Sequence, residues 1–205
     1  MNAKDTKDQN NKPNQQSNDS KTSTAHDKNK VINLQRIYVR DISLEVPNAP
    51  HVFEKEWRPK VDAHVNSSSR MIKDNVYESS LKIEVTAKND SKIAFIVDVT
   101  QCGSFVLANL NREELSRTLG ITCPNTLFPY ARETLDNLLM KGGMPPMHLA
   151  QINFHALYET QRRDAEARAA ADPNSGGGDS DKDQDLTQNL NKKLVINIPQ
   201  KDKIN

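Results

Sequence analysis

The sequence predicts an α+β domain in which strands precede helices, flanked by two polar ends. Apolar residues in the first half of the central segment alternate with polar ones, as in half-buried strands. In its second half they recur every three or four residues, as in helices that pack on one side. The first 30 residues, in contrast, contain only three apolar side chains, those of Met1, Ala3 and Ala25.

The composition divides the chain into three parts. Apolar residues make up 35% of the 205 residues, against about 45–50% in a typical globular domain. Segments with few apolar side chains cannot offset the entropy lost on ordering. We therefore predict a disordered polar N-terminal extension over 1–30, one domain over 31–163, and a frayed helix end with a disordered tail over 164–205.

Several protein classes are excluded. The formal net charge is +1, with no segment basic enough for a phosphate-backbone binder, so we expect no nucleic-acid partner. A run of about 18 apolar residues is absent, as is an apolar stretch after the first lysines. We therefore expect a cytoplasmic protein without membrane insertion. Cys102 and Cys123 are too few for a disulfide scaffold or a zinc knuckle.

The clearest strand spans residues 77–87, with apolar residues on one face and Glu78, Lys82 and Glu84 on the other. The Asn-Asp-Ser sequence at 89–91 favours a tight turn, and residues 93–99 alternate again. Together they predict an antiparallel hairpin. The second face of its later strand mixes Ala94, Ile96, Asp98 and Thr100.

Two further strands are predicted nearer the N-terminus. Residues 61–65 make a short alternating strand. The segment 34–46 changes phase near Arg40 and Asp41, so its apolar residues move from one face to the other. Either a bulge lies there, or the strand is covered on both faces, as at an interface with a second chain.

The segment 47–59 joins these strands and contains three prolines, which argue against a helix or a central strand. It also carries Val52, Phe53 and Trp57. A loop with such large apolar groups either covers the core or offers a binding surface.

Three helices are expected after the strands. Asn111 begins a capping pattern, Leu115 and Leu119 lie four residues apart, and Gly120 is expected to end this short helix. A second helix spans 130–139, with Pro129 in its first turn and Gly142-Gly143 at its end. Asn153 can cap a last helix that frays into the alanine-rich residues 165–171.

No catalytic set emerges from the residues. The five histidines have no metal-ligand spacing, no glycine-rich phosphate loop is present, and each cysteine is expected to be a small buried hydrophobe. We therefore expect no enzyme activity, cofactor or metal. The apolar stretch 144–149 and the loop 47–59 are left as candidate binding surfaces, with plain core packing as the equal alternative.

Three stretches of the sequence are distinctive: QRIYVRDISLEVPNAP at 35–50, followed by Phe53 and Trp57; CPNTLFPYARE at 123–133; and LAQINFHALY at 149–158. Together, in this order, they resemble the SecB family of bacterial export chaperones. The resemblance covers residues 34–161. It implies a four-stranded antiparallel sheet with two main helices packed on one face, assembled into a homotetramer as a dimer of dimers.

The resemblance also implies a function and partners. A SecB-like protein holds unfolded preproteins in the cytoplasm without ATP and delivers them to the SecA motor. The loop 47–59 corresponds to a crossover loop that roofs an apolar groove between the sheet and the final helix.

The site residues that the resemblance implies fall into three sets. The client groove would contain Val52, Phe53, Trp57, Met144, Met147 and Leu149. The exposed sheet face would bind SecA through Asp41, Glu45, Ile96 and Asp98. The dimers would meet at Leu115 and Leu119 on the first helix.

The sequence also departs from the family pattern. Relatives are usually strongly acidic, whereas this chain is near neutral, so electrostatic steering towards SecA is expected to be weaker. The β-prone run 194–198 could add to a sheet edge, occupy the groove or be disordered. The alternative function is a SecB-like chaperone for another client, such as an antitoxin.

Overall fold

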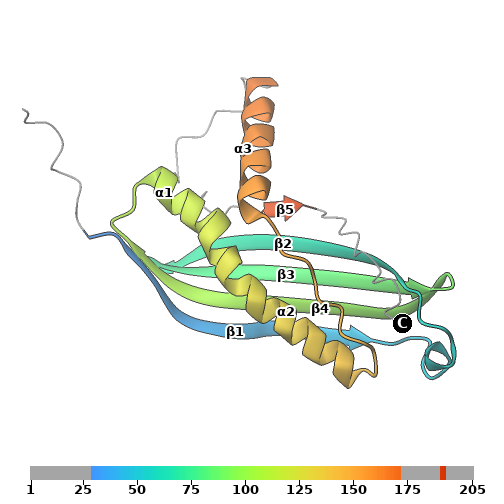
Figure 1. The fold of residues 1–205 in the computed structure, drawn as a ribbon. Helices are drawn as coiled ribbons and strands as arrows, with labels where there is room; N and C mark the ends of the chain where they lie inside the picture. The colour runs from blue at the N-terminus through green and yellow to red at the C-terminus, as the bar shows by residue number, and fades with distance from the viewer. Residues whose placement is uncertain (1–28, 172–189, 193–205) are drawn as a thin grey trace, which may run out of the picture.

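The computed structural model describes residues 29–171 and 190–192. Four long antiparallel strands form one sheet, and a long helix crosses one of its faces (Figure 1). The strands are β1 (Val31–Glu45), β2 (Lys60–Lys73), β3 (Val76–Asn89) and β4 (Lys92–Ala108). They lie in the order β1-β4-β3-β2, and the short strand β5 (Leu190–Lys192) adds to the free edge of β2. The expected four-stranded antiparallel sheet is confirmed, with β5 as an addition.

The predicted hairpin is formed by β3 and β4. Asp90 and Ser91 occupy its turn with φ values of 49° and 66°, a left-handed conformation that Asp and other short polar residues tolerate better than bulky ones. The strands are longer than the alternation indicated. β2 continues to Lys73, but the alternation of apolar residues does not reveal this because serines occupy the inward positions 67 and 69.

The phase change in β1 is a bulge. The register with β4 shifts between Val39 and Asp41, which leaves Arg40 without a partner opposite. A second shift, between Leu34 and Arg36, was not predicted. Each extra residue rotates the following side chains to the other face, so Ile37, Val39, Ile42 and Leu44 all lie on the face that carries the helix.

The helices α1 (Arg112–Arg117) and α2 (Cys123–Lys141) form one continuous run through a π-helical turn, η2 (Thr118–Thr122). The capping box predicted at Asn111 is present, with Glu114 as its partner. The expected stop at Gly120 is wrong. A Cβ there would lie 2.5 Å from the ring of Tyr158, so the glycine permits close helix packing instead of ending the helix.

The long helix α2 begins at Cys123, six residues before the expected start at Pro129. Pro124 occupies its first turn, where the missing N–H is tolerated, and Pro129 lies inside the helix. The predicted end is confirmed: Gly142 caps α2, and Gly143 follows with a φ of 75°.

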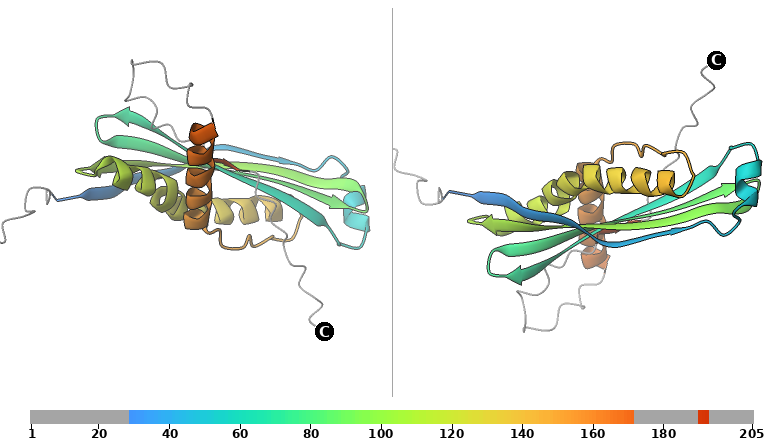
Figure 2. Two further views of the ribbon diagram at one scale, coloured as in Figure 1. Left: turned by 90° about the horizontal axis from the view of Figure 1, so that it is seen from above. Right: turned by 90° about the horizontal axis from the view of Figure 1, so that it is seen from below.

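The last helix, α3 (Phe154–Ala171), begins after Asn153, whose side chain accepts a hydrogen bond from the Ala156 backbone N–H at 3.0 Å. It stands off beside the β2 edge while α2 runs along the sheet (Figures 1 and 2). It packs on the η2 turn through Tyr158, whose hydroxyl lies 2.8 Å from that of Ser116. All three expected helices are therefore present, but of the two main ones only α2 lies along the sheet.

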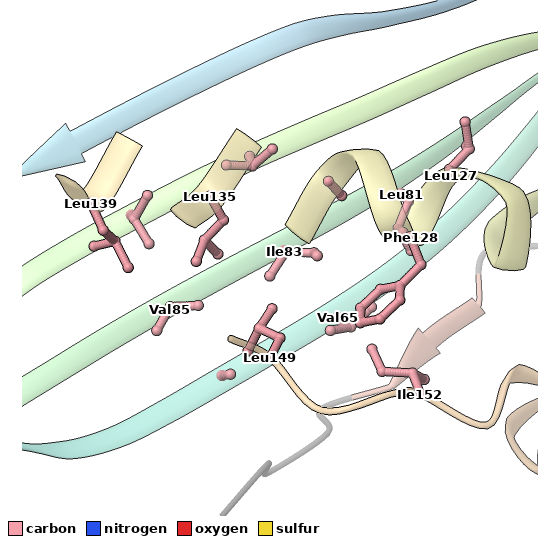
Figure 3. Close-up of a cluster of buried hydrophobic side chains, with 14 of the residues drawn as sticks. Val65, Leu81, Ile83, Val85, Leu127, Phe128, Leu135, Leu139, Leu149 and Ile152 are labelled. Atoms are coloured by element: carbon pink, nitrogen blue, oxygen red, sulfur yellow. The ribbon is translucent and has the colours of Figure 1, made fainter. Parts of the chain in front are cut away.

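The hydrophobic core lies between the sheet, α2 and the segment 144–153 that follows α2 (Figure 3). Leu135 and Leu139 of α2 reach the inner face of β3, and Leu149 and Ile152 cover the part nearest β2. In the part of the chain that the structure describes, no helix is long and apolar enough to cross a membrane.

Candidate functional site: one apolar patch and one charged sheet face

The residues expected to line a client groove divide into buried and accessible groups. Val52, Met144 and Leu149 belong to the core and are at most 7% exposed. Phe53 is 51% exposed, and Trp57 and Met147 are partly buried at the edge of the core. Only the last three can contact another chain without opening the core.

The loop 47–59 is held against the β3–β4 turn. Asn89 donates to the Glu56 carbonyl at 2.9 Å and accepts from the Arg58 N–H at 3.0 Å. The ring of Trp57 stacks on Phe95, with centroids 6.4 Å apart. Within the loop, residues His51–Glu54 form one 3-10 turn.

This location corrects the expected groove. The loop lies at the end of the sheet beyond the C-terminal end of α2, whereas α3 lies near α1 and η2 (Figures 1 and 2). The loop therefore does not roof a space between the sheet and the final helix. It borders the end of α2 and the start of the segment 144–153.

The end of α2 gathers an apolar surface that the sequence only partly indicated. A Cβ at Gly143 would lie 3.3 Å from the Phe53 ring, so this glycine lets the loop approach the helix end. Met140, 52% exposed, lies on the last turn of α2. We call Phe53, Trp57, Met140 and Met147 the α2-end patch. Met140 was missed because it falls outside the buried stripe of its helix.

Asp136 fixes the segment that carries Met147. Its Oδ1 accepts the backbone N–H groups of Met147 at 2.9 Å and His148 at 3.1 Å, and its Oδ2 lies 3.1 Å from His148 Nδ1. Arg132, one turn earlier, donates to the Leu149 carbonyl at 3.4 Å. Because Met140 is four residues after Asp136, it shares the helix face that meets Met147. The hydrogen bonds of Asp136 thus position one side of the α2-end patch.

The residues expected to bind SecA lie on the sheet face opposite α2. Across β1 and β4, Glu45 lies opposite Ile96, and Ser43 lies opposite Asp98. Glu45, Ile96 and Asp98 are therefore close together. Asp41, opposite Thr100, lies one such pair further along the strands. Asp41 and Glu45 are exposed, and Ile96 is partly buried.

Asp98 differs from the other acids because it is already paired. Lys82 Nζ lies 2.8 Å from Asp98 Oδ2 and 2.6 Å from Glu84 Oε1. The hydrogen bond to Asp98, followed by that to Glu84, raises the pKa of Lys82. A partner would therefore meet Asp98 as one side of an ion pair, whereas Asp41 and Glu45 are open to it.

A second charged cluster on this face went unrecognised in the sequence. Glu78 is only 5% exposed, bonds to Arg70 Nε at 2.6 Å and accepts from the Tyr38 hydroxyl. Burial alone would raise the pKa of Glu78, but the hydrogen bonds from Arg70 and Tyr38 outweigh it and lower the pKa. The bond to Glu78, with burial second, raises the pKa of Tyr38 to about 12. The cluster joins β1, β2 and β3.

The two leucines expected at the interface between dimers differ in how exposed they are. Leu119 is 3% exposed and belongs to the core, while Leu115 is partly buried beside it. β1 is more accessible: apart from β4, no described strand pairs with it, and its exposed apolar side chains are Val31, Ile32, Val39 and Ile42.

The two thiols are unsuited to chemistry at neutral pH. Cys102 and Cys123 are both buried, and burial raises the pKa of Cys123 to about 12. Among the described residues, no three His, Cys, Asp or Glu side chains are placed to hold a metal ion.

Comparison with known proteins identifies the family. The family model for the preprotein translocase subunit SecB matches residues 25–165. The protein-export protein SecB of Hahella chejuensis is 44% identical over 144 residues, which are 70% of this chain and 91% of that protein. SecB of Pseudomonas fluorescens is 48% identical over 131 residues, 63% of this chain and 81% of its own.

A solved structure shares the fold. A SecB-like chaperone of Mycobacterium tuberculosis, in complex with a peptide from an antitoxin, superposes with a TM-score of 0.50 at 17% identity, covering 60% of this chain and 91% of its own. The family match and the export-protein relatives, together with this sheet and its helices, show that the chain belongs to the SecB family of protein-export chaperones.

Proposed function

We propose that this chain is an ATP-independent holdase that keeps precursors of exported proteins unfolded in the cytoplasm and delivers them to SecA. The observation that carries the proposal is the α2-end patch, an accessible apolar surface on a chain of this family. Unfolded chains share no sequence, so their recognition must rest on apolar burial and backbone hydrogen bonds.

The patch suits varied clients. Methionine side chains adapt to irregular apolar partners, and Met140 and Met147 add such side chains to the more rigid aromatic group of Phe53. Trp57 is anchored by its stacking on Phe95, so it acts mainly to hold the loop in place. Val52, Met144 and Leu149 support the patch from the core.

Delivery to SecA would use the opposite face of the sheet, around Asp41, Glu45 and Ile96. Asp98 contributes less because Lys82 neutralises it. Exposed ion pairs contribute only about 0–1 kcal/mol each. Binding would therefore depend on several acids acting together, and it would weaken as salt rises.

The active form would be a homotetramer. β1 has exposed apolar side chains and a free edge, a combination that proteins usually cover. We infer that two subunits pair there and that the dimers meet through α1, at Leu115 and its surroundings. Leu119 would support that surface from within.

The alternative, a chaperone for an antitoxin, is less well supported. The relatives at 44–48% identity are export proteins, whereas the antitoxin-bound chaperone is only 17% identical and supports the fold alone.

The test is binding to purified SecA with and without an unfolded precursor, in the absence of nucleotide. An export chaperone should form a ternary complex, and Asp41→Asn with Glu45→Gln should weaken it. Precursor binding without any SecA binding would contradict the delivery role and favour another client.

A further inference from the structure

The strand β5 occupies the outer edge of β2. Leu190, Asn191 and Lys192 pair antiparallel with Ser67, Asn66 and Val65, respectively. The pairing is far from α3 in sequence, since β5 begins 19 residues after Ala171, where that helix ends. The C-terminal part of the chain therefore returns to the sheet as an added strand (Figure 1).

This edge is suited to any extended chain. The remaining backbone N–H and C=O groups of an edge strand accept a partner strand regardless of its sequence. On the inner side of β2, Val65 lies next to Leu149 and Ile152, so an added strand runs beside an apolar surface (Figure 3). A strand-forming client would find here the same backbone bonds that β5 uses.

The β5 pairing is short, and the β2 residues beneath it are incompletely satisfied. Asn66 Oδ1 and Ser67 Oγ are buried and have no hydrogen-bond partner within the described residues. Because β5 pairs through only three residues and leaves these side-chain atoms without partners, it is easier to displace than a long, fully bonded strand.

We propose that β5 is an intramolecular competitor of client chains: it occupies the β2 edge in the free protein and is displaced when an unfolded chain adds there. The proposal rests on the proposed holdase function. Because residues 65–67 of β2 have one set of outward backbone groups, β5 and a client that adds at these residues exclude each other. β5 then lowers the apparent affinity in proportion to the fraction of molecules in which the edge is open.

The size of the effect follows from that fraction. If three paired residues keep the edge closed in about two thirds to nine tenths of the molecules, removing β5 tightens client binding about threefold to tenfold. A client must then bind strongly enough to displace β5, which favours clients with long extended segments over weak contacts with folded proteins.

The experiment compares four full assemblies: the parent, a truncation that removes residues 190–205, Asn191→Pro and the control Gln184→Pro. A proline inside β5 disrupts its backbone pairing while preserving the charge of the tail. Gln184→Pro places the same residue outside β5. The probe is reduced, carboxymethylated α-lactalbumin, a permanently unfolded protein, titrated by fluorescence anisotropy.

The proposal expects the truncation and Asn191→Pro to tighten binding about threefold to tenfold, with Gln184→Pro at the parent value. Equal affinities in all four assemblies would overturn it and leave the holdase function standing. Absence of binding in all four would contradict the holdase function itself and the competitor role with it.

Discussion

Phe53 and Leu149 were both expected to bind clients, but one lies at the surface and the other in the core, so we expect opposite mutant phenotypes. Phe53 is 51% exposed, whereas Leu149 is 1% exposed and lies between α2 and the sheet. We predict that Phe53→Ala weakens client binding with little loss of stability. Leu149→Ala should destabilise the fold and leave the affinity of the folded protein nearly unchanged.

The magnitudes follow from the exposed areas. An aromatic side chain can bury about 150–250 Å², and about half of that remains available on Phe53. At about 25 cal/mol per Å², complete burial by a client contributes at most about 2–3 kcal/mol, so a loss of about 1–3 kcal/mol is expected. Truncation of a fully buried leucine typically costs about 2–5 kcal/mol of folding free energy.

Two assays separate these outcomes. Urea unfolding gives the change in stability, and titration with an unfolded precursor, at a temperature where both variants are folded, gives the change in affinity. The reasoning is refuted if Phe53→Ala loses more than about 2 kcal/mol of stability while binding clients as the parent does. Phe53 would then be a core residue.

Four further perturbations test other parts of the account. Asp136→Ala should release the segment around Met147, with a loss of about 1.5–3 kcal/mol in urea unfolding and faster amide exchange at residues 147–148. Asp41→Asn with Glu45→Gln should weaken SecA binding about tenfold at low salt and less at high salt, because exposed charges are screened; equal loss at both salts would argue against a charge effect. Leu115→Asp should halve the assembly mass measured by light scattering, and an unchanged mass would move the dimer–dimer contact elsewhere. Because the pKa of Glu78 is lowered in the folded state, its carboxylate stabilises the fold at pH values above the unfolded-state pKa of about 4.5. This contribution is lost as pH falls through the folded-state pKa. Glu78→Gln removes the ionisable group, so it should flatten the acid side of the curve of unfolding free energy against pH.

Features encoded by local chemistry could be predicted from the sequence. The Asn-Asp-Ser turn of the β3–β4 hairpin, the capping box at Asn111 and the glycine pair after α2 each depend on a few adjacent residues. The bulge at Arg40 was visible because a single extra residue reverses the alternation of the strand. In each case the backbone preference and the wider fold agree.

Predictions failed where distant contacts override a local preference. Gly120 is a helix-ending signal by itself, but the helix continues because Tyr158, 38 residues later, packs directly against it. The same applies to Leu149 and Met147, which lie two residues apart in a segment without periodicity. Their different burial is set by Asp136 and Arg132 of α2, which hold that segment in place. The Glu78 cluster likewise joins three strands far apart in the sequence.

The predicted N-terminal extension falls almost entirely on residues 1–28, and the β-prone run 194–198 falls within the tail; both lie outside the described residues. The tail nonetheless reaches the sheet at residues 190–192, next to the run that the sequence indicated.

The measurement that tests the central claim most directly is light scattering from an exported-protein precursor diluted from denaturant, with this protein present and nucleotide absent. A holdase should suppress aggregation at about one assembly per precursor, and Phe53→Ala with Met147→Ala should restore much of the scattering while the mass of the assembly stays at the parent value and its melting temperature changes little. Scattering unaffected by the parent protein at any ratio would contradict the account.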